Sequence, residues 1–173
     1  LVVKWPGVTK AGSTCKEPVI GVDFYPTFME VAGIKRPKSL KLDGLSFVPC
    51  LKDASVSLGR EALYWHFPVY LQGYTARHGA FRTTPAAAIR MGDWKLIEFF
   101  EDSTLELYNL KQDLGEKNNL AAKMPDKVKE LHASMLKWRE AVKAPVPTEK
   151  NPKYEPNAKF TPPRRGKGKQ NKK

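Results

Sequence analysis

The chain has 173 residues, of which 41% are hydrophobic and 28% are charged, a composition typical of a globular protein with one hydrophobic core. Its longest apolar run, residues 18–22, is far shorter than the ~20 residues that cross a bilayer, which argues against a membrane-spanning helix in this sequence. The two cysteines, Cys15 and Cys50, are too few for a disulfide framework and lack the spacing of a zinc site.

The net charge of +12 is concentrated at the C-terminal end. Residues 144–173 contain nine Lys and Arg against Glu149 and Glu155, so this stretch carries +7 and the rest of the chain carries +5. A basic tail on a nearly balanced body is typical of a solvated extension, or of one that contacts polyanions loosely. We favour the solvated extension and keep the polyanion contact as an alternative.

The N-terminal part predicts a short strand and a helix. Residues 1–4 are an apolar run ended by a Trp-Pro-Gly turn, which predicts a buried strand. Asp23 is suited to cap a helix over residues 23–32, whose apolar side chains share one face before Gly33 ends it. We expect this helix to pack on the strand. Residues 34–42 form a Lys- and Pro-rich connection.

The middle of the chain predicts a four-stranded antiparallel sheet. Asp43-Gly44 indicates a turn that opens a buried segment at residues 45–51. An aromatic strand follows at residues 61–70, ended by Pro68, and residues 71–85 read as a loop. Three β-prone runs joined by hairpin turns complete the sheet, at residues 86–91, 94–100 and 104–110.

A helix is predicted at residues 125–142, where it would cover one face of the sheet. Its apolar stripe is narrow and follows helical spacing: Val128, Leu131, Met135, Trp138 and Val142. His132 is expected on the solvated side of this helix, and we assign it no role. Residues 145–173 are rich in Pro and Lys, which predicts a disordered tail.

Three stretches of the sequence carry a family resemblance. The first is Val3-Lys4-Trp5-Pro6-Gly7 with Asp23-Phe24-Tyr25-Pro26-Thr27 and Ala32-Gly33; the second is Ala88-Ile89-Arg90-Met91-Gly92-Asp93-Trp94-Lys95-Leu96-Ile97; the third is Glu106-Leu107-Tyr108-Asn109-Leu110 with Asp113, Glu116 and Asn119-Leu120. In this order and spacing they resemble the C-terminal portion of the type I sulfatases, in particular bacterial arylsulfatase A-like members of the alkaline phosphatase-like superfamily. The resemblance extends over residues 1–150.

The resemblance implies an α+β fold in three parts. Residues 1–45 would be the end of the large α/β sulfatase domain, a strand plus a helix. Residues 46–144 would be a subdomain in which the four-stranded antiparallel sheet packs against the C-terminal helix. Residues 145–173 would be the disordered basic tail.

The same resemblance implies a sulfuric ester hydrolase. In that family a formylglycine, made from Cys or Ser in a Cys-x-Pro-x-Arg type motif, attacks sulfur beside a calcium ion. Cys15 is followed by Lys16-Glu17-Pro18 and Cys50 by Leu51-Lys52-Asp53, so neither fits the motif. By motif order the nucleophile and the metal ligands precede residue 1, so we assign no catalytic residue and no metal residue. The segment would close the substrate cleft and be inactive alone.

Three residues are candidates for contact with the sulfate ester. His66 is a polar residue in an aromatic strand that ends toward a long loop, where sites usually lie. It would line the pocket or be a satisfied structural histidine. Arg77 and His78, with Arg82 nearby in that loop, would meet an anionic sugar or remain solvated.

Two other functions stay open at this stage. One is a non-catalytic module derived from the family, whose tail at residues 159–173 binds polyanions such as nucleic acid or sulfated glycans. The other is a segment of a related phosphoesterase. For the sulfatase, the resemblance implies a sulfated glycan as substrate, the missing N-terminal sulfatase domain as partner, and a periplasmic or secreted location.

Overall fold

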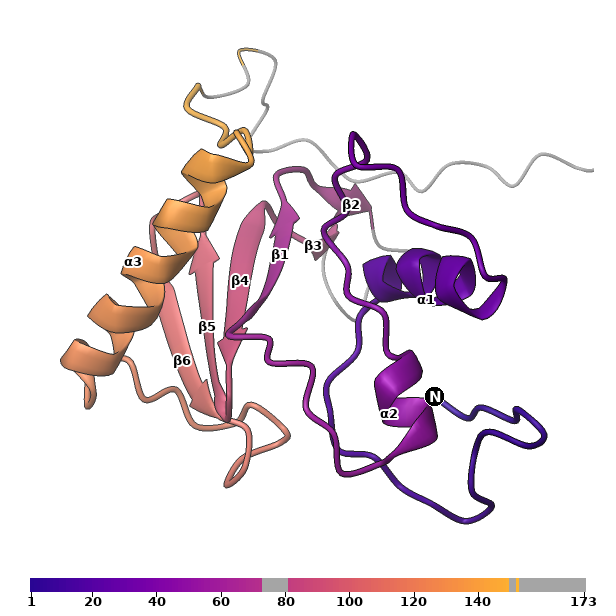
Figure 1. The fold of residues 1–173 in the computed structure, drawn as a ribbon. Helices are drawn as coiled ribbons and strands as arrows, with labels where there is room; N and C mark the ends of the chain where they lie inside the picture. The colour runs from indigo at the N-terminus through magenta and orange to yellow at the C-terminus, as the bar shows by residue number, and fades with distance from the viewer. Residues whose placement is uncertain (73–80, 150–151, 153–173) are drawn as a thin grey trace, which may run out of the picture. The chain divides into compact units, whose positions relative to one another are not determined.

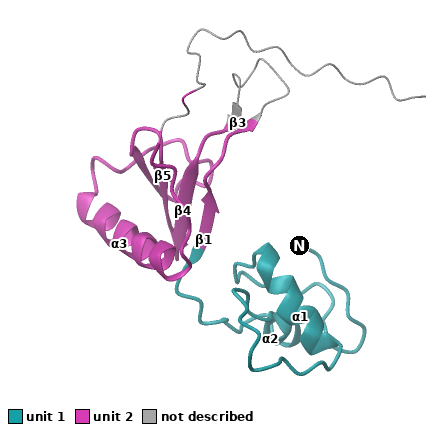
Figure 2. Ribbon diagram, turned by 90° about the horizontal axis from the view of Figure 1, so that it is seen from above, with its two compact units in different colours: residues 1–63 teal, residues 64–173 magenta. Residues whose placement is uncertain are grey.

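A computed structural model of the chain describes residues 1–72, 81–149 and 152. The chain divides into two compact units, residues 1–63 and residues 64–173 (Figure 2). The domain boundary predicted between residues 45 and 46 lies inside the first unit. Within the described ranges, no helix has the length and apolar character needed to cross a membrane.

The first unit is built around two short helices. A 3₁₀ turn, η1 (Gly21–Asp23), leads directly into α1 (Phe24–Val31), and α2 (Val48–Lys52) follows after a connecting segment (Figure 1). The predicted helix at residues 23–32 is therefore confirmed. The buried segment predicted at residues 45–51 overlaps α2, whose core side chains include Val48 and Cys50.

The strand predicted at residues 1–4 is wrong. These residues have no regular secondary structure, and Val2 is 96% exposed. A strand needs a neighbouring strand for its backbone hydrogen bonds. Up to residue 62, the described part of this unit contains no other strand, so the apolar pattern of residues 1–4 finds no sheet to join.

The second unit contains the predicted four-stranded antiparallel sheet. Its strands lie in the order β1-β4-β5-β6. The four elements are β1 (Leu63–Phe67), β4 (Ala86–Met91), β5 (Trp94–Phe99) and β6 (Leu105–Asn109). The hairpin from β4 to β5 turns at Gly92, whose φ of 57° suits a residue without a Cβ.

The region predicted as a loop, residues 71–85, contains two additional strands. β2 (Leu71–Gln72) pairs antiparallel with β3 (Phe81–Thr83), with Leu71 opposite Thr83. Strands of two and three residues are too short to produce a readable alternation of apolar and polar residues. The loop prediction was therefore wrong at both ends of this segment.

Helix α3 (Pro125–Ala141) lies along one face of the sheet, as predicted (Figure 1). The core between them consists of side chains that are almost fully buried: Ile89 from β4, Leu96 from β5, Leu107 from β6, and Leu131 and Met135 from α3. Because side chains alternate along a strand, Leu96 and Glu98 share the face toward α3, and Lys95 and Ile97 share the other.

Candidate functional site

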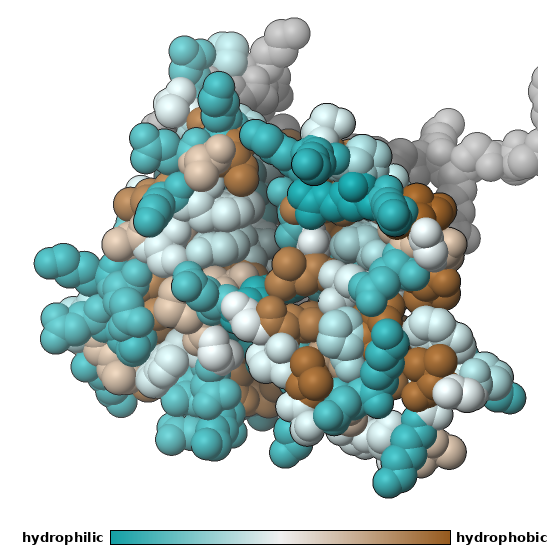
Figure 3. Space-filling view, viewed as in Figure 1, coloured by the Kyte–Doolittle hydropathy of each residue, from teal (hydrophilic) through white to brown (hydrophobic). Residues whose placement is uncertain are grey.

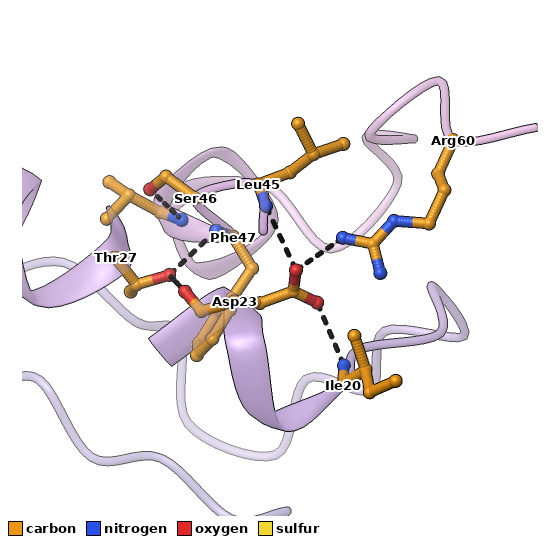
Figure 4. Close-up of polar contacts among 8 residues, drawn as sticks. Ile20, Asp23, Thr27, Leu45, Ser46, Phe47 and Arg60 are labelled. Atoms are coloured by element: carbon orange, nitrogen blue, oxygen red, sulfur yellow. Dashed lines mark hydrogen bonds and ion pairs between the residues drawn. The ribbon is translucent and has the colours of Figure 1, made fainter. Parts of the chain in front are cut away.

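A buried carboxylate, Asp23, holds the first unit together (Figure 4). Its Oδ2 accepts the Ile20 N–H at 2.8 Å, and its Oδ1 accepts the Leu45 N–H at 2.9 Å as well as a hydrogen bond from Arg60. Asp23 therefore caps the 3₁₀ turn before α1 and binds two segments that follow much later in the sequence.

The surroundings of Asp23 keep it ionised. Burial disfavours the charge, but the hydrogen bond from Arg60 and those from the amides of Ile20 and Leu45 together outweigh it, so the pKa of Asp23 lies below its ordinary value of 3.8. Thr27 continues the network: its hydroxyl donates to the Asp23 carbonyl at 2.7 Å and accepts the Phe47 N–H at 3.0 Å. These bonds explain why two polar residues are buried here.

The structure places His66 between the sheet and the chain that leaves α3. Its Nε2 lies 2.6 Å from the Pro145 carbonyl oxygen, and its ring lies 5.4 Å from Phe100 and 6.4 Å from Trp138 between centroids. Its Nδ1 is buried and has no hydrogen-bond partner among the described residues. The contact of His66 with substrate stays a prediction.

The other two candidate residues, Arg77 and His78, lie outside the described residues, and so does the side chain of Arg82. Their contact with substrate therefore stays a prediction. The predicted tail, beyond residue 149, also lies outside the described residues except for Pro152.

Sequence reasoning missed a charged cluster between β5 and α3. The Nη1 of Arg139 lies 3.0 Å from Glu98 Oε2, and the Nε2 of His132 lies 3.4 Å from Glu98 Oε1. Both pairs of atoms lie within ion-pair distance, but neither pair has the geometry of a hydrogen bond. The Arg139 guanidinium also stands over the Phe100 ring at 5.4 Å.

Two predictions about α3 are corrected by this cluster. His132 is not on the solvated side, because its side chain is 28% exposed and turned to Glu98. Val142 was expected in the apolar stripe but is exposed, and Arg139 is buried in its place. The signal was present in the sequence: Arg139 follows Leu131 and Met135 at intervals of four residues, which puts it on the same helix face.

The described residues do not fit the metal or the nucleophile of a sulfatase. Over residues 1–72 and 81–149, no three His, Cys, Asp or Glu side chains gather as a metal site would require. The buried carboxylates of Asp23 and Glu98 are already paired with cationic side chains. Burial raises the pKa of the Cys50 thiol to about 11, so it is protonated and unreactive at neutral pH.

Helix α1 carries a hydrophobic surface. Tyr25, Phe28, Val31 and, just beyond the helix, Ile34 are all exposed, with Phe28 at 63%. Hydrophobic side chains are visible over the α1 and α2 region of this unit in the space-filling view (Figure 3). Beside them lies an open cavity of about 300 Å³, lined by Pro26, Met29 and Leu45 among others. Exposed apolar side chains that gather on one surface are typical of interaction sites.

Comparison with known proteins shows which family this chain resembles. Residues 1–141 match the family described as N-sulphoglucosamine sulphohydrolase, C-terminal. A sulfatase of Formosa agariphila is 39% identical over 134 residues, which cover 72% of this chain and 23% of the relative. An N-acetylglucosamine-6-O-sulfatase of Bacteroides thetaiotaomicron is 34% identical over 155 residues, which cover 87% of this chain and 26% of the relative.

Solved structures share the fold. A protein solved in complex with its substrate D-glucosamine-2-N,6-O-disulfate has a TM-score of 0.66 and 33% identity, over 86% of this chain and 29% of that one. A phosphonate monoester hydrolase from Silicibacter pomeroyi has a TM-score of 0.59 and 25% identity, over 80% of this chain and 28% of that one. The chain spans about a quarter of the length of the relatives that it matches. With its sheet, its C-terminal helix and a family match over residues 1–141, the chain belongs to the sulfatase family and is a C-terminal portion of such an enzyme.

Proposed function

We propose that this chain is the C-terminal part of a sulfuric ester hydrolase that acts on sulfated carbohydrate. The observation that carries the proposal is its similarity to an N-acetylglucosamine-6-O-sulfatase and to a structure solved with a disulfated glucosamine. In this proposal the second unit closes the substrate cleft. The nucleophile and the metal would come from the rest of the enzyme, since this chain spans only about a quarter of the length of its relatives.

The hydrophobic surface of α1 supports the proposal that this chain packs against another part of the enzyme, which supplies the nucleophile and the metal. Phe28 and Tyr25 would be costly to leave in water, at roughly 25 cal/mol for each Å² of apolar surface. In the proposed enzyme they are buried against the preceding α/β domain, the partner that the sequence predicted. This chain thus contributes packing and substrate contact, while calcium and formylglycine would supply charge stabilisation and the attacking oxygen elsewhere in the enzyme.

His66 is the residue of this chain that we propose for substrate contact, with Arg77 and His78 as further candidates from the following loop. An imidazole and a guanidinium are suitable donors to sulfate oxygens. The test is His66→Ala in the complete enzyme, with kcat, KM and melting temperature measured together. A rise in KM at unchanged melting temperature supports the contact. Unchanged kinetics with a lower melting temperature would mean that His66 only holds the Pro145 carbonyl.

A related phosphoesterase is the second candidate function. The similarity to a phosphonate monoester hydrolase favours it, because the two kinds of enzyme share the fold of this segment. Sulfate monoesters and phosphonate monoesters each carry one negative charge at pH 7, whereas phosphate monoesters carry nearly two, so charge distinguishes a sulfate ester only from a phosphate monoester. The polyanion-binding tail is a third candidate, based only on the charge of residues 159–173.

The experiment that tests the proposed function uses the complete enzyme that contains this chain. It is supplied with calcium and given 6-O-sulfated glucosamine, an aryl sulfate and an aryl phosphate, and release of sulfate or phosphate is measured. We expect the highest kcat/KM on the sulfated sugar. Faster phosphate release would replace the proposal with the phosphoesterase. A sulfated glycan as substrate also agrees with a periplasmic or secreted location, which we propose on the same ground.

A further inference from the structure

Residues 143–149, which follow α3, form a strap that makes few contacts with the rest of the second unit. All of them are exposed except Ala144, which is half-buried. Among the described residues, one side-chain hydrogen bond holds the strap, from His66 Nε2 to the Pro145 carbonyl oxygen at 2.6 Å. Pro145 and Pro147 stiffen the strap, because a proline ring fixes one backbone angle. A stiff, exposed segment with so few contacts can leave the protein surface as a unit.

A strained turn at the end of α3 directs the strap. The Lys143 N–H donates to the Glu140 carbonyl at 3.1 Å. The Ala144 N–H donates to the Arg139 carbonyl at 2.9 Å. This pair of bonds is a Schellman motif, which ends a helix with one residue in the left-handed conformation. That residue is Lys143, with a φ of 53°, although a side chain makes this conformation unfavourable. A change at Lys143 that eases or increases the strain should therefore shift the strap between a seated and a released position.

The strap occupies the nitrogen that His66 could offer to a ligand. A carbonyl oxygen can only accept a hydrogen bond, so Nε2 carries the proton in the contact with Pro145. The other ring nitrogen, Nδ1, is buried and is therefore closed to a ligand. A sulfate oxygen is also an acceptor, so it would need the same N–H. The Pro145 carbonyl and a sulfate oxygen cannot both bind Nε2 of His66 at the same time.

We propose that the strap is an autoinhibitory element, which seats on His66 in the absence of substrate and is displaced by the sulfate ester. The inference rests on the proposed function, in which His66 contacts the substrate. Because the substrate binds His66 only when the strap is released, its apparent affinity falls in proportion to the released fraction. The turn at Lys143 sets that fraction, since its strain lowers the stability of the seated position.

The first test compares Lys143→Gly with Lys143→Val in the complete enzyme. Both variants remove the lysine charge, and they differ in how well the residue adopts a φ of 53°. Glycine adopts this conformation freely, whereas a β-branched residue adopts it poorly. The KM for 6-O-sulfated glucosamine should rise about fivefold in Lys143→Gly, because the strap stays seated longer. It should fall below the original value in Lys143→Val, and kcat should be unchanged in both variants.

The second test measures trypsin cleavage after Lys143 in the complete enzyme, which reports release of the strap without any need for turnover. His66→Ala should speed this cleavage at least about threefold, because it removes the hydrogen bond to Pro145. His66→Gln should keep the original rate, since its amide N–H can still donate to that carbonyl. Added 6-O-sulfated glucosamine should speed cleavage of the original enzyme but not of His66→Ala.

The two tests distinguish a failure of the strap from a failure of the proposed function. If the complete enzyme does not hydrolyse the sulfated sugar, the proposed function is wrong and the strap has no substrate to exclude. If the sugar is hydrolysed and His66→Ala raises KM, three results would overturn the strap alone. They are a lower KM in Lys143→Gly, the same KM in both Lys143 variants, and a rate of trypsin cleavage that the sugar leaves unchanged.

Discussion

The indole ring of Trp138 stacks on the phenol ring of Tyr64, with centroids 4.7 Å apart and planes 2° from parallel. Tyr64 belongs to β1 and Trp138 to α3, and the Tyr64 hydroxyl lies 3.0 Å from Ser134 Oγ on the same helix. An aromatic pair contributes about 0.5–1.5 kcal/mol beyond the area that it buries. The pair therefore stabilises the packing of β1 against α3.

Replacing Trp138 with Ala should lower the free energy of unfolding by about 3 kcal/mol, since it removes the stacked ring and leaves a cavity against β1. The control is Leu136→Ala on the same helix, because Leu136 is 43% exposed. The control should lose at most about 0.5 kcal/mol in chemical denaturation. Equal losses in the two variants would contradict the packing described here.

Removing the carboxylate in Glu98→Ala should cost about 3 kcal/mol, because it leaves the buried Arg139 guanidinium without its counter-charge. The double variant Glu98→Leu/Arg139→Met should recover much of this loss, since it buries two apolar side chains instead of one unpaired charge. As a control, Glu130→Ala breaks the exposed pair with Lys127 and should cost at most about 1 kcal/mol. If Glu98→Ala unfolded at the same denaturant concentration as this control, the cluster would have no structural role.

Sequence analysis predicted those parts of the fold in which a regular pattern of apolar residues is bounded by turn residues. The strands around Leu96 and the helix that covers them were predicted because alternation and helical spacing are both local properties. Residues 1–4 have the composition of a strand, but whether a strand forms depends on a partner that local sequence does not describe.

Sequence analysis did not predict the partners of the buried polar side chains. Asp23 was expected to cap α1, yet its carboxylate is bound by Leu45 and Arg60, which are distant in sequence. Glu98 and Arg139 are paired only because the sheet and the helix meet. Long-range pairing of this kind requires the folded arrangement.

Gly44 is the position where an added methyl group should do most damage. A Cβ at Gly44 would lie 2.1 Å from the Val22 carbonyl oxygen and 2.9 Å from the Asp23 Cα, and neither backbone atom can move freely. Gly44→Ala should therefore lose about 2 to 3 kcal/mol of stability. Gly21→Ala is the matched control, since a Cβ there meets nothing within 4 Å. A thermal melt that showed the same shift for both variants would refute this close approach.

Asp23 should give the first unit a defined sensitivity to acid. Because the pKa of Asp23 in the folded chain lies below its ordinary value of 3.8, the unfolded chain takes up the proton first as the pH falls. The stabilisation is complete above pH 3.8 and is lost as the pH drops through the folded-state pKa. Asp23→Asn does not titrate at this position and serves as the reference.

The quantity to measure is the free energy of unfolding of the original chain minus that of Asp23→Asn, obtained in urea at several pH values. We expect this difference to be positive and constant from about pH 7 to about pH 5, and to shrink below about pH 4. The effects of all other carboxylates cancel in the difference. A difference that stayed constant down to about pH 3 would show that Asp23 is not held ionised by its neighbours.

The central claim is that this chain supplies the C-terminal part of a sulfatase without the groups that perform the reaction. The most direct measurement gives the purified chain calcium and a chromogenic aryl sulfate, and compares its rate with buffer and with the complete enzyme. We predict turnover by the complete enzyme only, because the described residues of the chain offer no metal site and neither cysteine fits the formylglycine motif. Reproducible turnover by the chain alone that disappears in Cys15→Ser or in Cys50→Ser would contradict the account.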